Sequence, residues 1–116
     1  MRHDESLTQQ ACVRWFRMQY PQYATLLFAV PNGGARNVVT ASILKAEGVV
    51  AGVADLLLLV PNGVSHGLCV EMKTGGGRQS VRQKAWQKSV TGQGYEYAVV
   101  RDVETFIEVV SGYLNR

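Results

Sequence analysis

The chain has few cysteines, no long apolar run and no internal repeat or low-complexity segment. Its two cysteines, Cys12 and Cys69, are too few for a disulfide framework, and each stands among apolar neighbours, where a free cysteine behaves as a small hydrophobic residue. The longest apolar stretch, residues 53–61, is interrupted by Asp55 and is far shorter than the roughly 20 residues that span a membrane. We therefore expect no disulfide scaffold, no thiolate metal site and no membrane-spanning helix.

The length and the first residues of the chain bound its organisation. A chain of 116 residues can bury one hydrophobic core and is too short for two, so we expect a single domain over residues 1–116. The first five residues are polar and lead directly into a helical pattern, without the apolar segment of a secretory signal. These features predict a cytoplasmic protein.

Hydrophobic periodicity and turn residues predict an alternation of helices and strands. Helices are expected over about residues 4–20, 37–47, 80–91 and from 102 onward, and strands over about 26–30, 54–60, 67–73 and 95–101. The short connection between the second and third strands predicts an antiparallel pair. The order α-β-α-β-β-α-β-α indicates an α/β domain with a mixed β-sheet flanked by helices.

Capping residues mark the expected helix boundaries. Asn37 and Gly48 are expected as the N-cap and the C-cap of the second helix. Ser80 to Gln83 has the form of a capping box that opens the third helix. Asp102 is expected to cap the last helix.

Three charged residues interrupt the apolar second and third strands: Asp55, Glu71 and Lys73. Because residues two apart on a strand share a face, Glu71 and Lys73 place a carboxylate beside an ammonium group. Asp55 can join them from the neighbouring strand. Charges among apolar residues are costly unless a partner or a metal ion compensates them, so this cluster is a candidate site.

The cluster requires a particular pairing of the two strands. If Val60 were opposite Gly67, Asp55 would oppose Met72 and would point away from the other two charged groups. A functional site needs Asp55 opposite residue 71 or 73, or a bulge between the strands.

The residue types of this cluster suit phosphodiester hydrolysis assisted by a divalent cation. Mg²⁺ prefers a few carboxylate oxygens and retains waters, so Asp55 and Glu71 are candidate ligands, with the backbone carbonyl of Val70 or Met72 nearby. Lys73 could orient or deprotonate the attacking water, or stabilise the charged transition state, and the sequence leaves these roles open.

Positive charge is concentrated just after the carboxylates, where it could hold a phosphate backbone. The basic residues of this segment are Lys73, Arg78, Arg82, Lys84 and Lys88. A solvated helix face is the alternative explanation, and the net charge of +3 permits a polyanionic partner without requiring one. The loop 31–36 carries Asn32 and Arg36, and it is either a simple turn or a further phosphate contact.

These segments resemble the VRR-NUC branch of the PD-(D/E)xK nuclease superfamily. The resemblance covers nearly the whole chain and rests on residues 48–56, 70–73, 83–86 and 94–95, with an early glutamate and the 32–33 loop. In that family an aspartate, a glutamate and a lysine form the metal site, assisted by a glutamate of the first helix and a later glutamine. The resemblance therefore implies catalytic roles for Asp55, Glu71, Lys73, Glu5 and Gln83. Ala54 departs from the family, which has proline there, but proline carries no catalytic group.

The resemblance also implies an activity, a cofactor and an assembly. Members of the stand-alone bacterial or phage type are similar to Holliday junction resolvases, which implies an endodeoxyribonuclease that uses Mg²⁺ or Mn²⁺, cuts branched DNA such as junctions or flaps, and works as a homodimer. A two-fold dimer presents paired sites to paired strands. The alternatives are a non-catalytic DNA-binding or assembly module, and a restriction-like cutter, for which so short a chain leaves little room to read sequence.

Several of these residues also have a structural explanation. Glu5 could supply a further carboxylate to the metal, directly or through water, or could merely complement the dipole of its helix. Gln83 occupies the N3 position of the capping box and could simply satisfy the backbone. Trp15 and Trp86 are expected in the core rather than as platforms for stacked bases.

Overall fold

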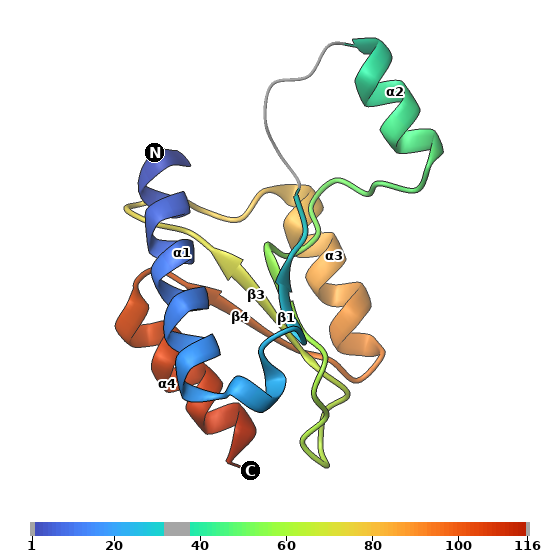
Figure 1. Ribbon diagram of the computed structural model, residues 1–116. Helices are drawn as coiled ribbons and strands as arrows, with labels where there is room; N and C mark the ends of the chain where they lie inside the picture. The colour runs from blue at the N-terminus through green and yellow to red at the C-terminus, as the bar shows by residue number, and fades with distance from the viewer. Residues whose placement is uncertain (1, 32–37, 116) are drawn as a thin grey trace.

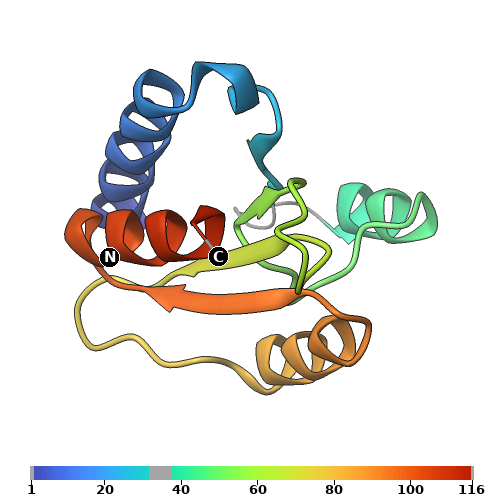
Figure 2. The same ribbon diagram turned by 90° about the horizontal axis from the view of Figure 1, so that it is seen from below.

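Helices cover both faces of a four-stranded mixed β-sheet (Figures 1 and 2). The computed structural model describes residues 2–31 and 38–115. Its helices are α1 (Arg2–Gln19), α2 (Val38–Ala46), α3 (Val81–Gly92) and α4 (Val103–Leu114), with a 3₁₀ turn, η1 (Pro21–Tyr23), after the first. Its strands are β1 (Leu27–Ala29), β2 (Leu56–Leu58), β3 (Leu68–Met72) and β4 (Glu96–Val100).

The order of elements confirms the fold class expected from the sequence, but the strands are shorter than predicted. The reduction is greatest in β2, because side chains take over backbone groups at both of its ends. Before the strand, the Asp55 carboxylate accepts the Met72 N–H at 2.7 Å. After it, the Val60 carbonyl accepts the Tyr113 hydroxyl at 2.6 Å. Regular pairing therefore covers only the apolar middle of the predicted strand.

The sheet has the strand order β1-β2-β3-β4. The pairs β1/β2 and β2/β3 are antiparallel, as expected for the short connection between β2 and β3. The pair β3/β4 is parallel, with α3 in the connection between them. The carboxyl end of β3 therefore lies beside the start of β2.

The register between β2 and β3 places Asp55 near Glu71. Leu56 lies opposite Val70 and Leu58 opposite Leu68, so Asp55 and Glu71 are the next residues beyond the last regular pair. The backbone there is irregular, because the Asp55 N–H donates to the Val70 carbonyl at 3.1 Å, one residue away from this register. Both carboxylates are thus at the same place on the sheet.

The two faces of the sheet have different partners. The face that carries Leu56, Leu58 and Val70 packs against α1 and α4 (Figure 2). The helical and β1 residues that are fully buried in this core are Cys12, Phe16, Leu27, Phe106, Val110 and Tyr113. Burial of each large apolar side chain contributes about 1.5–3 kcal/mol, so this side of the sheet supplies most of the packing energy. The other face, which includes Tyr97, is covered by α3.

Helix α2 projects from the rest of the fold (Figure 1). None of its residues is buried, and Val38, Val39 and Ile43 are 82%, 68% and 53% exposed. The helix ends at Ala46, and Gly48, just past this end, has a φ of 107°, as expected for the glycine that terminates a helix. The predicted N-cap, Asn37, lies outside the described residues.

The remaining helix caps are as expected. The Ser80 Oγ accepts the Gln83 N–H at 3.1 Å and the Gln83 Oε1 accepts the Ser80 N–H at 2.8 Å, which completes the capping box. The Asp102 carboxylate accepts the Thr105 N–H at 2.7 Å. These bonds satisfy donors that a helix leaves unpaired at its start.

The cysteines are buried as expected and Trp15 packs against the core, whereas Trp86 does not belong to it. Cys12 and Cys69 are buried and free, and burial raises the pKa of each thiol to about 11, so both stay protonated. Trp15 packs edge-on against Phe106 at 6.2 Å between ring centroids. Trp86 is half-buried and contacts the Tyr97 ring edge-on at the same distance. No described helix combines the length and apolarity needed to cross a membrane.

Candidate active site

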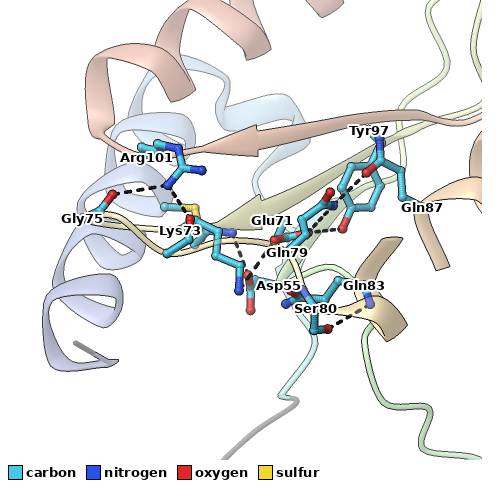
Figure 3. A network of polar contacts seen from close by, with 12 residues as sticks. Asp55, Glu71, Lys73, Gly75, Gln79, Ser80, Gln83, Gln87, Tyr97 and Arg101 are labelled. Atoms are coloured by element: carbon cyan, nitrogen blue, oxygen red, sulfur yellow. Dashed lines mark hydrogen bonds and ion pairs between the residues drawn. The ribbon is translucent and has the colours of Figure 1, made fainter. Parts of the chain in front are cut away.

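A cavity of about 610 Å³ opens where β2 begins and β3 ends. The first turns of α1, the segment before β2, the end of β3 and the start of α3 all contribute to its walls. Four of the predicted catalytic residues share this lining: Glu5, Asp55, Lys73 and Gln83. The fifth, Glu71, lies beside them within the sheet (Figure 3).

Asp55 enters the cavity from the irregular segment that precedes β2. One of its oxygens, Oδ2, accepts the Met72 N–H. Burial raises the pKa of the Asp55 carboxyl, and the nearby charges of Glu71 and Glu5 raise it further, while the Met72 N–H and Lys73 oppose the shift. The ionised carboxylate is therefore held in an unfavourable environment that an added cation would improve.

Glu71 is the only charged residue that is fully buried in the described part of the chain. Its Oε1 accepts two hydrogen bonds, from the Tyr97 hydroxyl at 2.5 Å and from Gln79 Nε2 at 3.0 Å (Figure 3). Its Oε2 is buried and accepts none. The nearest cation to Oε2 is the Lys73 Nζ, at 3.8 Å, which is too long for a hydrogen bond.

These residues fit a hard divalent cation. A buried carboxylate oxygen without a hydrogen bond is costly, and Glu71 Oε2 is such an atom. Mg²⁺ is commonly held by one or two carboxylates and keeps several waters, and Asp55 and Glu71 would be the carboxylates to hold it here. Among the side chains described in residues 4–31 and 38–115, no group of three His, Cys, Asp or Glu is close enough to hold a metal by itself. Any ion would therefore retain waters or take substrate oxygens.

Glu5 lines the same cavity from the first turns of α1. Its neighbours on the lining, Ser6 and Gln9, show that this end of α1 faces the site. The charge of Glu5 contributes to the raised pKa of Asp55, so the two carboxylates are close enough to interact. Further along α1, Cys12 and Phe16 are buried in the core and hold the helix in place.

Gln83 is part of the capping box and also lines the cavity. Its Oε1 is occupied by the Ser80 N–H, as the structural explanation predicted. The residue nevertheless lines the cavity with Ser80 and Arg82, so the cap places the start of α3 at the site.

The basic residues that were predicted to bind DNA do not form one cluster. Arg82 lines the cavity, whereas Arg78, Lys84 and Lys88 are exposed and lie outside its lining. Lys84 is two positions after Arg82 on α3, which is about 200° around the helix, so the two side chains leave it on different sides. Asn32 and Arg36, with Gly33 and Gly34, lie outside the described residues.

Sequence reasoning did not identify the residues that surround Glu71. Tyr97 is on β4, where the parallel pairing sets it opposite Cys69 and on the same face as Glu71. Its pKa is raised by burial and by the hydrogen bond to Glu71, so it keeps its proton and donates. Gln79 lies in the loop before α3, and its Nε2 also donates to Gln87 Oε1 at 2.8 Å. A tyrosine in an alternating strand and glutamines in a loop and a helix carry no signal of this role.

The mixed sheet thus carries Asp55, Lys73 and the buried Glu71 close together beside one cavity. The family model for the VRR-NUC domain matches residues 1–104, so the chain belongs to this family of nuclease-type domains. A solved structure described as a VRR_NUC domain protein is similar, with a TM-score of 0.83 and 24% sequence identity over 96% of this chain and 88% of that chain. At 24% identity this structural similarity establishes the fold of the chain and nothing more specific. The search of curated proteins finds no significant match.

Proposed function

We propose that the protein is a divalent-metal-dependent endodeoxyribonuclease that hydrolyses phosphodiester bonds in branched DNA. The observation that carries this proposal is the buried Glu71 Oε2, which accepts no hydrogen bond beside Asp55 and Lys73. Membership of the VRR-NUC family supports a nuclease, with DNA as its substrate. The choice of Mg²⁺ or Mn²⁺ rests on the all-oxygen character of the ligands.

The chain's own residues divide the work of hydrolysis. Asp55 and Glu71 hold the ion, which when bound polarises the phosphate and makes a water more acidic. Lys73 lies 3.8 Å from Glu71 Oε2, where its ammonium group can orient the attacking water or stabilise the added negative charge. The water oxygen bonds to phosphorus and its proton leaves to a base or to solvent, while the bond from phosphorus to one ester oxygen breaks and that oxygen takes up a proton to leave as a hydroxyl group.

Substrate preference and assembly are further parts of this proposal. Arg82 on the cavity wall provides a contact for a phosphate next to the scissile bond. A homodimer would supply paired sites for the paired strands of a junction, and its support is the resemblance together with this symmetry argument. We place the activity in the cytoplasm, where the cell's or phage's DNA is accessible.

The test is cleavage of a labelled four-way junction, a 5′ flap and a plain duplex, each with Mg²⁺, Mn²⁺ or EDTA. We expect metal-dependent cutting of the branched substrates that disappears in Glu71→Gln, which keeps the shape of the side chain but removes its charge. Glu108→Gln on the exposed side of α4 is the matched control and should cut normally.

Binding measured on the same substrates separates the two classes of function. DNA binding with no cutting by the wild type under any metal condition would identify a non-catalytic module and overturn the proposal. Equal cutting of duplex and junction would leave the nuclease standing and overturn its preference for branched DNA.

A further inference from the structure

We propose that Tyr97 and Gln79 are positioning residues that fix the orientation of the Glu71 carboxylate and so determine the affinity of the site for its divalent cation. This inference rests on the proposed function, because it concerns the same carboxylate. It adds two residues that the catalytic motif does not include.

The two oxygens of Glu71 differ in the hydrogen bonds that they accept. Both donors reach Oε1, the Tyr97 hydroxyl at 2.5 Å and Gln79 Nε2 at 3.0 Å. Oε2 is equally buried, yet it has no hydrogen bond. A carboxylate oxygen has two lone pairs, so Oε1 is saturated and has no capacity for a further ligand.

This asymmetry selects the oxygen that is left to bind a cation. A half-turn of the carboxyl group would only exchange two equivalent oxygens, whereas any smaller rotation would pull the accepting oxygen away from both donors, which is costly inside the protein. The two bonds therefore hold Oε2 on the side of Lys73, as Figure 3 shows. A preoriented ligand loses less freedom when it binds metal, and outer hydrogen bonds of this kind are typically worth a factor of roughly 10–100 in metal affinity.

Both donors are themselves held in place by other elements. The Tyr97 ring is on β4 and contacts the edge of the Trp86 indole on α3. The Gln79 amide also donates to Gln87 Oε1 on α3, at 2.8 Å. Glu71 is thus connected to the neighbouring strand and to the helix that covers this face of the sheet.

The loop that carries Gln79 is anchored from β4 as well. Arg101, the residue after β4, donates through Nη1 to the carbonyl of Gly77 at 2.8 Å and to that of Gly75 at 3.3 Å. A glycine-rich loop would otherwise have many conformations, so these bonds limit where the next residues lie. The donor to Glu71 is therefore preorganised before any cation binds.

The test compares two tyrosine-to-phenylalanine variants of the full chain. Tyr97→Phe removes only the hydroxyl that donates to Glu71 and keeps the ring against Trp86. Tyr113→Phe is the matched control, because it removes a buried hydroxyl that donates to the Val60 carbonyl at 2.6 Å, in the core below α4. Mn²⁺ binding is measured without DNA, by titration with electron paramagnetic resonance detection of free Mn²⁺, and the melting temperature is measured in EDTA.

We expect Tyr97→Phe to raise the dissociation constant for Mn²⁺ by about 10-fold or more, and Tyr113→Phe to leave it unchanged within twofold. Cleavage by Tyr97→Phe should need a correspondingly higher Mn²⁺ concentration, with a smaller change in the rate at saturating metal. Gln79→Met removes the other donor to Glu71, which lies in a loop, and should shift the Mn²⁺ dissociation constant in the same direction. It provides the test if Tyr97→Phe does not fold.

The outcomes separate this inference from the proposed function. Normal Mn²⁺ affinity in both Tyr97→Phe and Gln79→Met, with only their melting temperatures lowered, would mean that the two residues are merely structural and would overturn the inference while the nuclease stands. A wild-type protein that binds no Mn²⁺ would overturn the inference and the metal-dependent function together.

Discussion

Among individual residues, Asp55 shows the conflict between function and stability most directly. Its carboxyl group is partly buried near Glu71 and Glu5, and its pKa is raised by burial above all. A carboxylate whose ionised form is disfavoured by burial and by like charges is destabilising at neutral pH. The charged cluster around Asp55 therefore lowers the stability of the protein without a bound cation.

Asp55→Asn should abolish cleavage and stabilise the metal-free protein at neutral pH. The folded protein holds the Asp55 proton more tightly than the unfolded chain, so its stability falls as pH rises from the ordinary pKa of 3.8 through the raised folded value. Asparagine carries no charge, and its amide oxygen can still accept the Met72 N–H. We expect a melting temperature in EDTA at pH 7 that is about 2 °C higher, and cleavage reduced by more than about 100-fold.

Thermal unfolding in EDTA at several pH values checks this prediction. The advantage of Asp55→Asn should disappear below the ordinary carboxyl pKa, where both side chains are neutral. An unchanged or lower melting temperature at pH 7 would show that the carboxylate is not destabilising.

At the scale of elements, the turn before β2 touches the first turn of α3. Gly52 has a φ of 89°, and a Cβ there would lie 2.8 Å from the carbonyl carbon of Arg82 and 2.9 Å from its oxygen. Backbone cannot move aside as a flexible side chain can. This contact sets the wall of the cavity between the two segments.

Gly52→Ala should destabilise the protein and displace the start of α3. Gly48→Ala is the matched control, because Gly48 also has a positive φ but its Cβ would meet nothing within 4 Å. We expect Gly48→Ala to cost about 1 kcal/mol from backbone strain and Gly52→Ala about 2 kcal/mol more from overpacking. Urea unfolding measures both, and equal losses would show that the contact yields without cost.

Gln83 allows the cap of α3 and the chemistry of the cavity to be separated. Gln83→Glu keeps a residue that suits the capping box, so the melting temperature should stay within about 2 °C of the wild type. The added negative charge on the cavity wall should repel phosphate and lower cleavage by about 10-fold at physiological salt. Ser80→Ala, which removes the cap, should instead cost about 1 kcal/mol in urea unfolding. Normal cleavage by Gln83→Glu would show that Gln83 has no role in the reaction.

At the scale of the whole molecule, the net charge of +3 is small, so the position of each basic side chain matters more for DNA binding than the total charge. Arg82 lines the cavity, whereas Arg14 is an exposed residue nine positions after Glu5 on α1, about 180° around that helix. The two arginines therefore offer a comparison of charge at the site with charge away from it.

Arg82→Ala should weaken DNA binding and reduce its dependence on salt. Loss of one phosphate contact lowers the slope of log affinity against log salt by about 1. Arg14→Ala should leave the slope unchanged. Fluorescence anisotropy with a labelled junction over a series of salt concentrations measures both slopes, and equal changes would indicate diffuse attraction rather than a contact at the cavity.

Much of the fold and of the candidate site could be predicted from local features. The caps at Ser80 and Asp102 and the periodic faces of the helices depend on residues a few positions apart, and all are present. The grouping of Asp55 with Lys73 and Glu71 followed from strand alternation and from the resemblance, and Asp55 and Lys73 line one cavity. The sheet's short strands and the position of Arg82 on the cavity wall were not predicted, because they depend on long-range pairing and packing.

The sequence by itself determined which segments become helices and strands, where the helices are capped and which charged residues interrupt the apolar strands, because these properties depend on neighbours along the chain. Only the tertiary structure decided the register that sets Leu56 opposite Val70 and so brings Asp55 near Glu71, the burial of Glu71, and the convergence of Tyr97 and Gln79 on one of its two oxygens. Register and burial follow from contacts between distant segments, whose energies come from the packing of the whole sheet against its helices.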